Sequence, residues 1–92
     1  MTFKYGFSKE FLETLKKIQK KHKPLYEAVL KKIDEIISRD DETIDFYKNL
    51  RYNLSDSKRV HVLKHYVLSF TVNKKENHIL FQKISHHDEA YK

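Results

Sequence analysis

Residues 58–72 read KRVHVLKHYVLSFTV and predict two strands joined by a tight connection. Over residues 58–63, valines alternate with polar residues, which is the period-two pattern of a half-buried strand whose polar face carries Arg59 and His61. Residues 66–72 alternate more strongly and form the clearest strand of the chain. The two faces of that strand carry Leu68, Phe70 and Val72, and Val67, Ser69 and Thr71. The stretch therefore predicts an antiparallel pair of strands.

Two helices and two further strands complete the pattern. Aromatic residues alternate over residues 2–7 and predict a short strand. Apolar residues then recur at helical spacing over residues 9–22 and again over residues 24–38. The short break between these two stretches makes them an antiparallel helical hairpin. After the strand pair, a polar loop at residues 73–77 leads to a last strand over residues 78–84.

The resulting order predicts an α+β fold, β-α-α-β-β-β, in a single domain over residues 1–92. Two helices can cover only one face of a small, mainly antiparallel sheet, so the opposite face is left for polar residues. Residues 39–45 form an acidic turn after the helices. Basic and aromatic side chains alternate over residues 46–56, which either contact RNA bases and phosphates or form a packed connecting loop.

The formal charge of the 92 residues is +6, and it is unevenly distributed. Residues 1–45 contain ten Lys and Arg against nine Asp and Glu. Residues 46–92 contain nine against four, together with five of the six His. A basic, His-rich half indicates a polyanion partner, with nucleic acid as the first candidate and an acidic protein as the second. Solubility alone is also compatible with this charge.

The composition argues against several classes of protein. Because the chain has no Cys, it has no disulfide, no thiolate metal site and no Cys nucleophile. It also has no apolar run of 18 residues and no apolar N-terminal signal segment, so we expect a cytoplasmic protein without membrane association. A Gly-rich phosphate loop and a GxSxG motif are both missing, which leaves nucleotide-dependent and α/β-hydrolase chemistry unsupported.

Histidines gather around the expected strand ends, at His61, His65, His86 and His87, and we expect His61, His65 and residues 86–91 to meet on the polar face of the sheet. Since histidine exchanges protons near neutral pH, one can take a proton from an RNA 2′-hydroxyl while another protonates the leaving 5′-oxygen. The cations that would stabilise charge on the phosphate are Lys48, Arg51, Lys58 and Arg59. This chemistry is metal-free RNA cleavage. Its alternative for each His taken singly is a surface role, and for the last eight residues a frayed terminus.

Metal binding is the rival chemical interpretation of the same histidines. Their spacing lacks the helical i, i+4 pair or the CxxC clip that would make such a signal specific. We therefore expect no metal and no cofactor. We also expect His22 and His78 to be surface residues.

Five segments occur in a characteristic order. Residues 5–18, YGFSKEFLETLKKI, lead from a strand into a Leu- and Lys-rich helix, and residues 47–51 read YKNLR. Residues 58–62, KRVHV, precede YVLSF at residues 66–70, and residues 86–92 read HHDEAYK. The ordered set resembles the RelE/ParE superfamily of toxins from type II toxin–antitoxin modules, over essentially the whole chain. The resemblance implies a RelE-like fold.

The resemblance also implies an activity and partners. A toxin of this kind is cytoplasmic, enters the ribosomal A site and cuts mRNA without a metal. It is blocked by an acidic, RelB-like antitoxin, with which we expect a toxin–antitoxin heterotetramer. The basic charge of the chain agrees with both kinds of partner.

The match is closest to the YafQ branch, which uses histidines. His61 and His87 fall on site histidines of that branch, and Tyr91 falls on the aromatic residue that ends its motif. Lys48 replaces a site histidine, and His65 replaces a site aspartate. The arginine-using RelE branch fits less well: Val67 and His87 stand where its site arginines stand, while Tyr91 is retained.

These positions imply roles for the predicted site residues. His87 acts as general acid. His86 either shares this role or simply precedes His87 in the chain, and His61 or His65 acts as general base. Phosphate is held by Lys48, Arg51, Lys58 and Arg59, while Tyr91 stacks on a base or orients the phosphate. Two alternatives stay open: a non-enzymatic, ParE-like toxin that inhibits DNA gyrase, and an inactive toxin-like domain that only binds its antitoxin.

Overall fold

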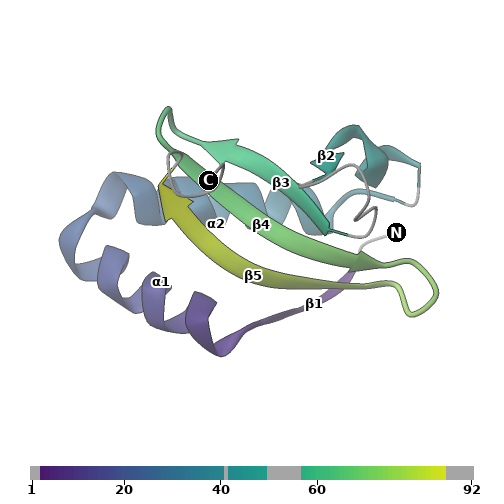
Figure 1. Ribbon diagram of the computed structural model, residues 1–92, viewed down its shortest axis with the longest axis horizontal. Helices are drawn as coiled ribbons and strands as arrows, with labels where there is room; N and C mark the ends of the chain where they lie inside the picture. The colour runs from purple at the N-terminus through teal and green to yellow at the C-terminus, as the bar shows by residue number, and fades with distance from the viewer. Residues whose placement is uncertain (1–2, 41, 50–56, 87–92) are drawn as a thin grey trace.

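The computed structural model describes residues 3–40, 42–49 and 57–86 (Figure 1). Within these ranges the elements follow in the order β1 (Lys4–Phe7), α1 (Lys9–Lys21), α2 (Lys23–Ile37), β2 (Lys48–Asn49), β3 (Ser57–Val62), β4 (Tyr66–Asn73) and β5 (His78–His86). A 3₁₀ turn, η1 (Thr43–Phe46), lies between α2 and β2. In this described part of the chain, the helices are too short and too polar to cross a membrane.

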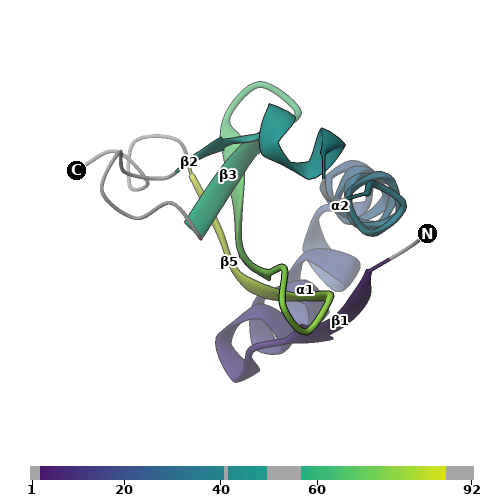
Figure 2. The ribbon, with the colours of Figure 1, turned by 90° about the vertical axis from the view of Figure 1, so that its right-hand side faces the viewer.

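The strands form one sheet in the order β1-β5-β4-β3-β2. β1 runs parallel to β5, and the other neighbouring strands are antiparallel. Figure 2 shows α1 and α2 on the same side of this sheet. The arrangement confirms the predicted α+β fold, with a helical hairpin on one face of a mainly antiparallel sheet.

β2 is a strand that the sequence pattern does not predict. It lies within the stretch 46–56, which we expected to be irregular, and it pairs Lys48 with Arg59 and Asn49 with Lys58 of β3. A strand of two residues is too short to show an alternating pattern. Its position therefore depends on the tertiary structure around it.

Helix α1 begins at Ser8, whose hydroxyl oxygen accepts a hydrogen bond from the Phe11 amide at 3.0 Å. This N-cap satisfies one of the amide groups that the first turn of a helix leaves without a partner. The same hydroxyl donates to the Gln82 carbonyl of β5 at 2.8 Å. The helix start is thus tied directly to the sheet.

A single residue, His22, separates the two helices. Its backbone is non-helical, with φ −148° and ψ 73°, and its Nδ1 atom accepts a hydrogen bond from the Leu25 amide at 3.3 Å. Pro24 sits in the first turn of α2, where the N–H that proline lacks would have no helical partner. His22 is therefore a half-buried helix cap, although the sequence predicted a surface residue.

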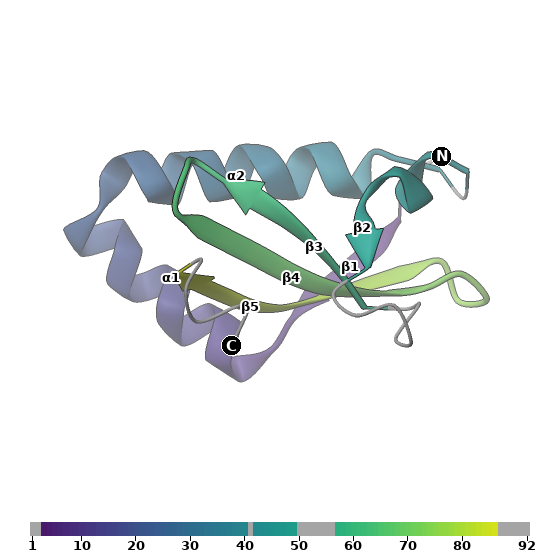
Figure 3. The ribbon, with the colours of Figure 1, turned by 45° about the horizontal axis from the view of Figure 1, so that its top comes forward.

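The core lies between the helices and the facing side of the sheet. Phe11 of α1 is fully buried against Phe81 of β5, with ring centroids 5.9 Å apart, and Phe81 lies 5.9 Å from Phe70 of β4. Figure 3 shows α2 running along the length of the sheet, from α1 at one end to η1 at the other. Val29, Ile33 and Ile36 of α2 are buried in the same core.

A bulge interrupts the pairing of β4 with β5. Ser69 lies opposite Lys83, but the next residue, Phe70, lies opposite Phe81, so Gln82 has no partner position on β4. An extra residue of this kind reverses the alternation of side chains along the bulged strand. Phe81 and Ile84 both face the core as a result.

Candidate active site

The sheet face away from the helices, hereafter the open face, carries a row of cations. Directly paired residues present their side chains on the same face, so Arg59 of β3, Ser69 of β4 and Lys83 of β5 form one row, and the backbone of Lys48 in β2 is paired with Arg59 at the end of that row. Arg59 is half-buried, Ser69 is buried and Lys83 is exposed. Because β-strand spacing is about 4.8 Å, the positions of Arg59 and Lys83, two strands apart, are about 10 Å from each other and fall within reach of neighbouring phosphate groups.

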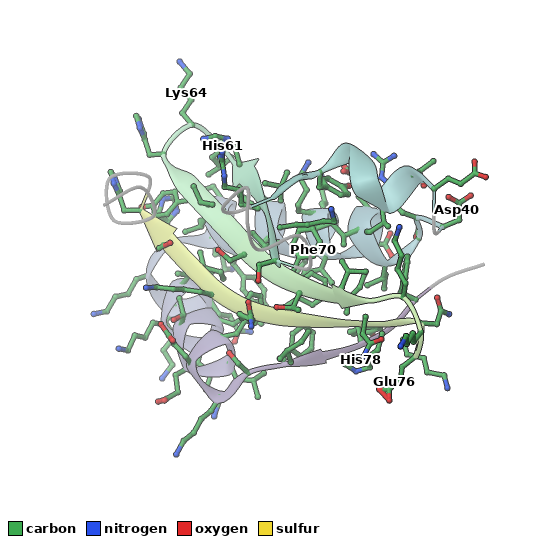
Figure 4. The ribbon with its side chains drawn as sticks, turned by 45° about the vertical axis from the view of Figure 1, so that its right-hand side comes forward. Asp40, His61, Lys64, Phe70, Glu76 and His78 are labelled. Carbon is green, nitrogen blue, oxygen red and sulfur yellow. The ribbon has the colours of Figure 1, made fainter. Side chains whose placement is uncertain are left out.

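His61 lies on the same face, two residues along β3 from Arg59. It pairs with Val67 of β4, and its side chain is exposed. Figure 4 shows His61 and Lys64 at one end of the sheet and His78 at the opposite end. Among the described positions of this face, none is an Asp or a Glu. An imidazole next to a cationic row, with no carboxylate between them, is an arrangement suited to an anionic substrate.

His65 and His86 come together at the turn between β3 and β4. Their rings are parallel, with 3° between the planes and 5.9 Å between the centroids. His86 also contacts Tyr66 edge-to-face at 5.6 Å, and Tyr66 contacts the His22 ring at 5.9 Å. Three imidazoles and one phenol therefore line this end of the domain.

The register places His61 and His86 on opposite faces of the sheet. His61 pairs with Val67, whereas His86 pairs with the adjacent residue, Tyr66. The sequence led us to expect that His61, His65 and the C-terminal segment meet on the open face. The structure brings His65 to His86, and it sets His61 beside the cationic row instead.

The remaining predicted site residues divide into two groups. His87, Tyr91 and Arg51 lie outside the described residues, and Lys48 is described through its strand pairing. Lys58 is only 4% exposed and pairs with Phe70, so its side chain leaves β3 on the face opposite Arg59. Lys58 is therefore placed less well for a substrate on the open face than Arg59.

Lys83 is a site candidate that sequence reasoning missed. If β5 alternated without interruption, Lys83 would share the face of Phe81 and Ile79, which point into the core. The bulge at Gln82 brings it to the open face instead. Lys83 directly follows another polar residue, Gln82, and this break in the alternation of β5 was the signal in the sequence that could have marked it.

A cluster of polar groups anchors the chain just before β2. The Tyr47 hydroxyl donates a hydrogen bond to the Glu35 carboxylate of α2 and accepts one from Arg39 Nε at 3.2 Å. The Arg39 guanidinium lies 5.0 Å from the centre of the Tyr47 ring, and Arg39 Nη2 lies 3.8 Å from Glu35 Oε2. Lys32 Nζ donates to Glu35 Oε1 at 3.2 Å.

The protonation equilibria of this cluster reflect its contacts. The hydrogen bond from Tyr47 is the main cause of a lowered pKa at Glu35, which partial burial opposes. Burial, followed by the hydrogen bond to Glu35, raises the pKa of Tyr47. Near neutral pH the cluster therefore contains an ionised Glu35 and a neutral Tyr47.

No group of three or more His, Asp or Glu side chains suited to a metal ion is found within the described ranges. Beside uncharged residues such as Ser69, the open face presents the cations Arg59 and Lys83 and the imidazole of His61. These can bind phosphate and move a proton, which are the two requirements of metal-free phosphodiester cleavage.

Comparison with individual known proteins shows the family of the chain, although no protein-family model matches it. It is 42% identical over 78 residues to "Putative toxin RelE4" of Methanocaldococcus jannaschii, and the matched region covers 85% of this chain and 79% of that protein. It is 36% identical over 75 residues to a protein of Methanosarcina mazei, covering 82% and 83% of the two chains.

A solved structure shows the same fold. The free-state structure of a mutant of the E. coli toxin RelE superposes with a TM-score of 0.74 and 17% sequence identity, covering 99% of this chain and 92% of that one. The archaeal relative supplies the sequence relationship, and the E. coli structure supplies the fold. The chain accordingly belongs to the RelE family of toxins.

Proposed function

We propose that this chain is the toxin of a type II toxin–antitoxin system and that it cuts mRNA on the ribosome without a metal or another cofactor. The observation that carries the proposal is the cationic row at Lys48, Arg59 and Lys83 with His61 beside it on the open face. Such a row suits a phosphodiester backbone, and the imidazole suits the proton transfer that cleavage requires. Membership of the RelE family agrees with this chemistry.

In the proposed reaction the RNA supplies its own nucleophile. A general base, His61 or His65, takes the proton of a 2′-hydroxyl, and the resulting oxygen attacks the adjacent phosphorus. The bond to the 5′-oxygen breaks, leaving a 2′,3′-cyclic phosphate on the upstream fragment. His87, with His86 next to it, protonates the leaving 5′-oxygen. Tyr91 stacks on a base or orients the phosphate.

The phosphate is held by a subset of the predicted cations. Arg59 is the first candidate because it lies on the open face, the backbone of Lys48 is paired with it in β2, and Lys83 joins them from β5. Arg51 belongs to the same set by its place in the sequence motif. Lys58 is the weakest member, since its side chain is buried on the other face.

Mapping of mRNA cleavage sites in a translation extract tests this proposal. The purified chain is added to a translation extract, and the 5′ ends of the mRNA are mapped. The wild-type chain should create new 5′ ends on translated mRNA and few on the same mRNA without ribosomes. If His61 is the general base, His61→Gln should lower the cleavage rate by about 100-fold or more, and if His65 is the base, His65→Gln should do so instead. His78→Gln, at the far end of the same face, is the matched control and should cut normally.

Growth arrest of cells that express the chain, without new 5′ ends in their mRNA, would contradict the nuclease proposal. Inhibition of DNA gyrase supercoiling by the purified chain would then favour the ParE-like, gyrase-inhibiting alternative. Absence of both effects, with the chain still folded, would favour a domain that only binds its antitoxin.

The proposed partners are an acidic, RelB-like antitoxin, the ribosome and mRNA, in the cytoplasm. The charge of +6 favours each of these partners. Coexpression with a neighbouring gene for a short acidic protein should yield a stable complex, for which we propose a heterotetramer. Light scattering of the copurified complex measures its mass, and a mass other than two copies of each chain would contradict that stoichiometry.

A further inference from the structure

The strand β2 is held weakly by the sheet alone. In the described part of the chain it has two residues at the edge of the sheet, and both pair with β3. A two-residue edge strand makes few hydrogen bonds, so its position is easily lost by local unfolding. If Lys48 is to act on a phosphate beside Arg59, something else must fix the backbone of β2.

Tyr47 provides a second anchor directly next to Lys48. Its side chain is 9% exposed, and its ring lies edge-to-face on Phe70 of the core with centroids 5.7 Å apart. Its hydroxyl joins Glu35 and Arg39 near the C-terminal end of α2. The residue that precedes β2 is thus attached at once to the core and to the long helix that spans the domain.

We propose that Tyr47 is a positioning residue, whose hydroxyl, held by Glu35 and Arg39, fixes β2 so that Lys48 stays in register with Arg59. This inference rests on the proposed function, because it assigns the contact of Lys48 with the RNA phosphate as the step that Tyr47 serves. Tyr47 itself lies in the packed interior between α2 and the sheet and touches no substrate.

The cluster has the strength that this role requires. The Tyr47 hydroxyl donates to the Glu35 carboxylate and accepts from Arg39 Nε at 3.2 Å, and the Arg39 guanidinium lies 5.0 Å from the centre of the Tyr47 ring. The hydrogen bond from Tyr47 lowers the pKa of Glu35, so the carboxylate that accepts it is ionised near neutral pH. Replacing tyrosine with phenylalanine would keep the ring on Phe70 and remove only the hydroxyl.

Single-turnover cleavage by the full chain on translating ribosomes tests the inference. Tyr47→Phe should lower the rate about tenfold, as a displaced phosphate-binding group does. In a chain that already carries Lys48→Ala, the same change should lower the rate less than about twofold, because the two residues act as one unit. Tyr26→Phe is the control: it removes a hydroxyl from Tyr26, a half-buried residue of α2, and should leave the rate unchanged.

Two variants of Glu35 separate positioning from simple stabilisation. Glu35→Gln keeps an oxygen that can accept the Tyr47 hydrogen bond, so most of the rate should be retained. Glu35→Ala should behave like Tyr47→Phe. A normal rate in Tyr47→Phe, or an unchanged tenfold loss in the Lys48→Ala background, would overturn the inference.

Hydrogen exchange gives a readout that does not require cleavage. In Tyr47→Phe the backbone amides of β2 should exchange about tenfold faster, while those of β4 and β5 keep their wild-type rates. Unchanged exchange in β2 would overturn the inference even if the wild-type chain cut no RNA. A different result separates the two proposals. If Tyr47→Phe exchanges faster in β2 but the wild-type chain cuts no RNA, the proposed function is refuted and Tyr47 is still the residue that holds β2.

Discussion

The Ser8 hydroxyl donates a hydrogen bond to the Gln82 carbonyl at 2.8 Å, and this contact joins the start of α1 to the bulge of β5. The Ser8 amide also donates to the Phe81 carbonyl at 2.9 Å. Gln82 is the residue that the register of β4 passes over. One serine therefore caps a helix and secures the irregularity that turns Lys83 toward the open face.

Replacing Ser8 with alanine should destabilise the domain. The change removes both the N-cap of α1 and the donor to Gln82, and the loss of such a cap alone costs about 1 kcal/mol. We expect the free energy of unfolding in urea to fall by about 1–2 kcal/mol, since a second hydrogen bond is lost as well. Ser38→Ala is the control, because Ser38 is an exposed residue at the end of α2 and donates only to the carbonyl of Asp34. An equal loss in both variants would contradict a special role of the Ser8–Gln82 contact.

The local parts of the fold could be predicted from the sequence. Residues 58–72 alternate with period two, and the faces of β3 and β4 follow that alternation as expected. The helices begin and end within one or two residues of their predicted bounds, because Ser8 and Pro24 are strong start signals. Each of these features is determined within a short segment of the chain.

The parts that could not be predicted depend on contacts between distant segments. The bulge at Gln82 is stabilised by Ser8, 74 residues earlier, so the adjacent polar residues Gln82 and Lys83 could not by themselves show which of the two faces away from the core. β2 is too short for a pattern and depends on Tyr47 meeting Glu35 of α2. Of the predicted site, His61 and Arg59 share the open face, while His87, Tyr91 and Arg51 stay predictions of the sequence.

Lys83 should contribute to RNA binding through its place on the open face. Lys83→Glu reverses a charge in the row that contains Arg59, so we expect cleavage of ribosome-bound mRNA to fall at least about tenfold and to become more sensitive to salt. Lys75→Glu makes the same change of net charge in the exposed β4–β5 turn and should change the rate less than about twofold. Equal effects of the two variants would mean that net charge, rather than the row, governs binding.

Leu63 adopts a backbone conformation that is unusual for its type. Its φ of 56° lies in the left-handed region, and its side chain is 51% exposed in the turn between β3 and β4. Glycine enters this region without the steric cost that other residues meet, which is about 1 kcal/mol. Leu63→Gly should therefore raise the free energy of unfolding by up to about 0.5–1 kcal/mol, measured by urea denaturation. The same change at Lys64, the next residue of the turn, should give no gain, and a loss of stability at Leu63 would show that its side chain makes a contact worth more than the strain.

The Glu35–Tyr47 contact should make stability depend on pH at the acidic end. The pKa of Glu35 is held below its ordinary value of 4.5, so the unfolded chain takes up a proton more readily than the folded one. The stabilisation is complete above pH 4.5 and is lost as the pH falls through the lowered pKa of the folded state. Since the Glu35 side chain is 43% exposed, the effect should stay below about 1 kcal/mol.

Urea unfolding of the wild-type chain and Glu35→Gln at pH 6 and at pH 3.5 measures this effect. Both chains lose stability on acidification because other carboxylates are protonated, but the loss should be smaller in Glu35→Gln, which has no carboxylate to protonate at this position. Glu27→Gln on the exposed side of α2 corrects for the removal of one negative charge and should follow the wild type. The contact would be shown to contribute nothing if Glu35→Gln and Glu27→Gln lost stability by the same amount between the two pH values. A smaller loss confined to Glu35→Gln would establish that the carboxylate anchoring Tyr47 is ionised in the folded chain, which is the state in which it accepts the phenol's hydrogen bond most strongly.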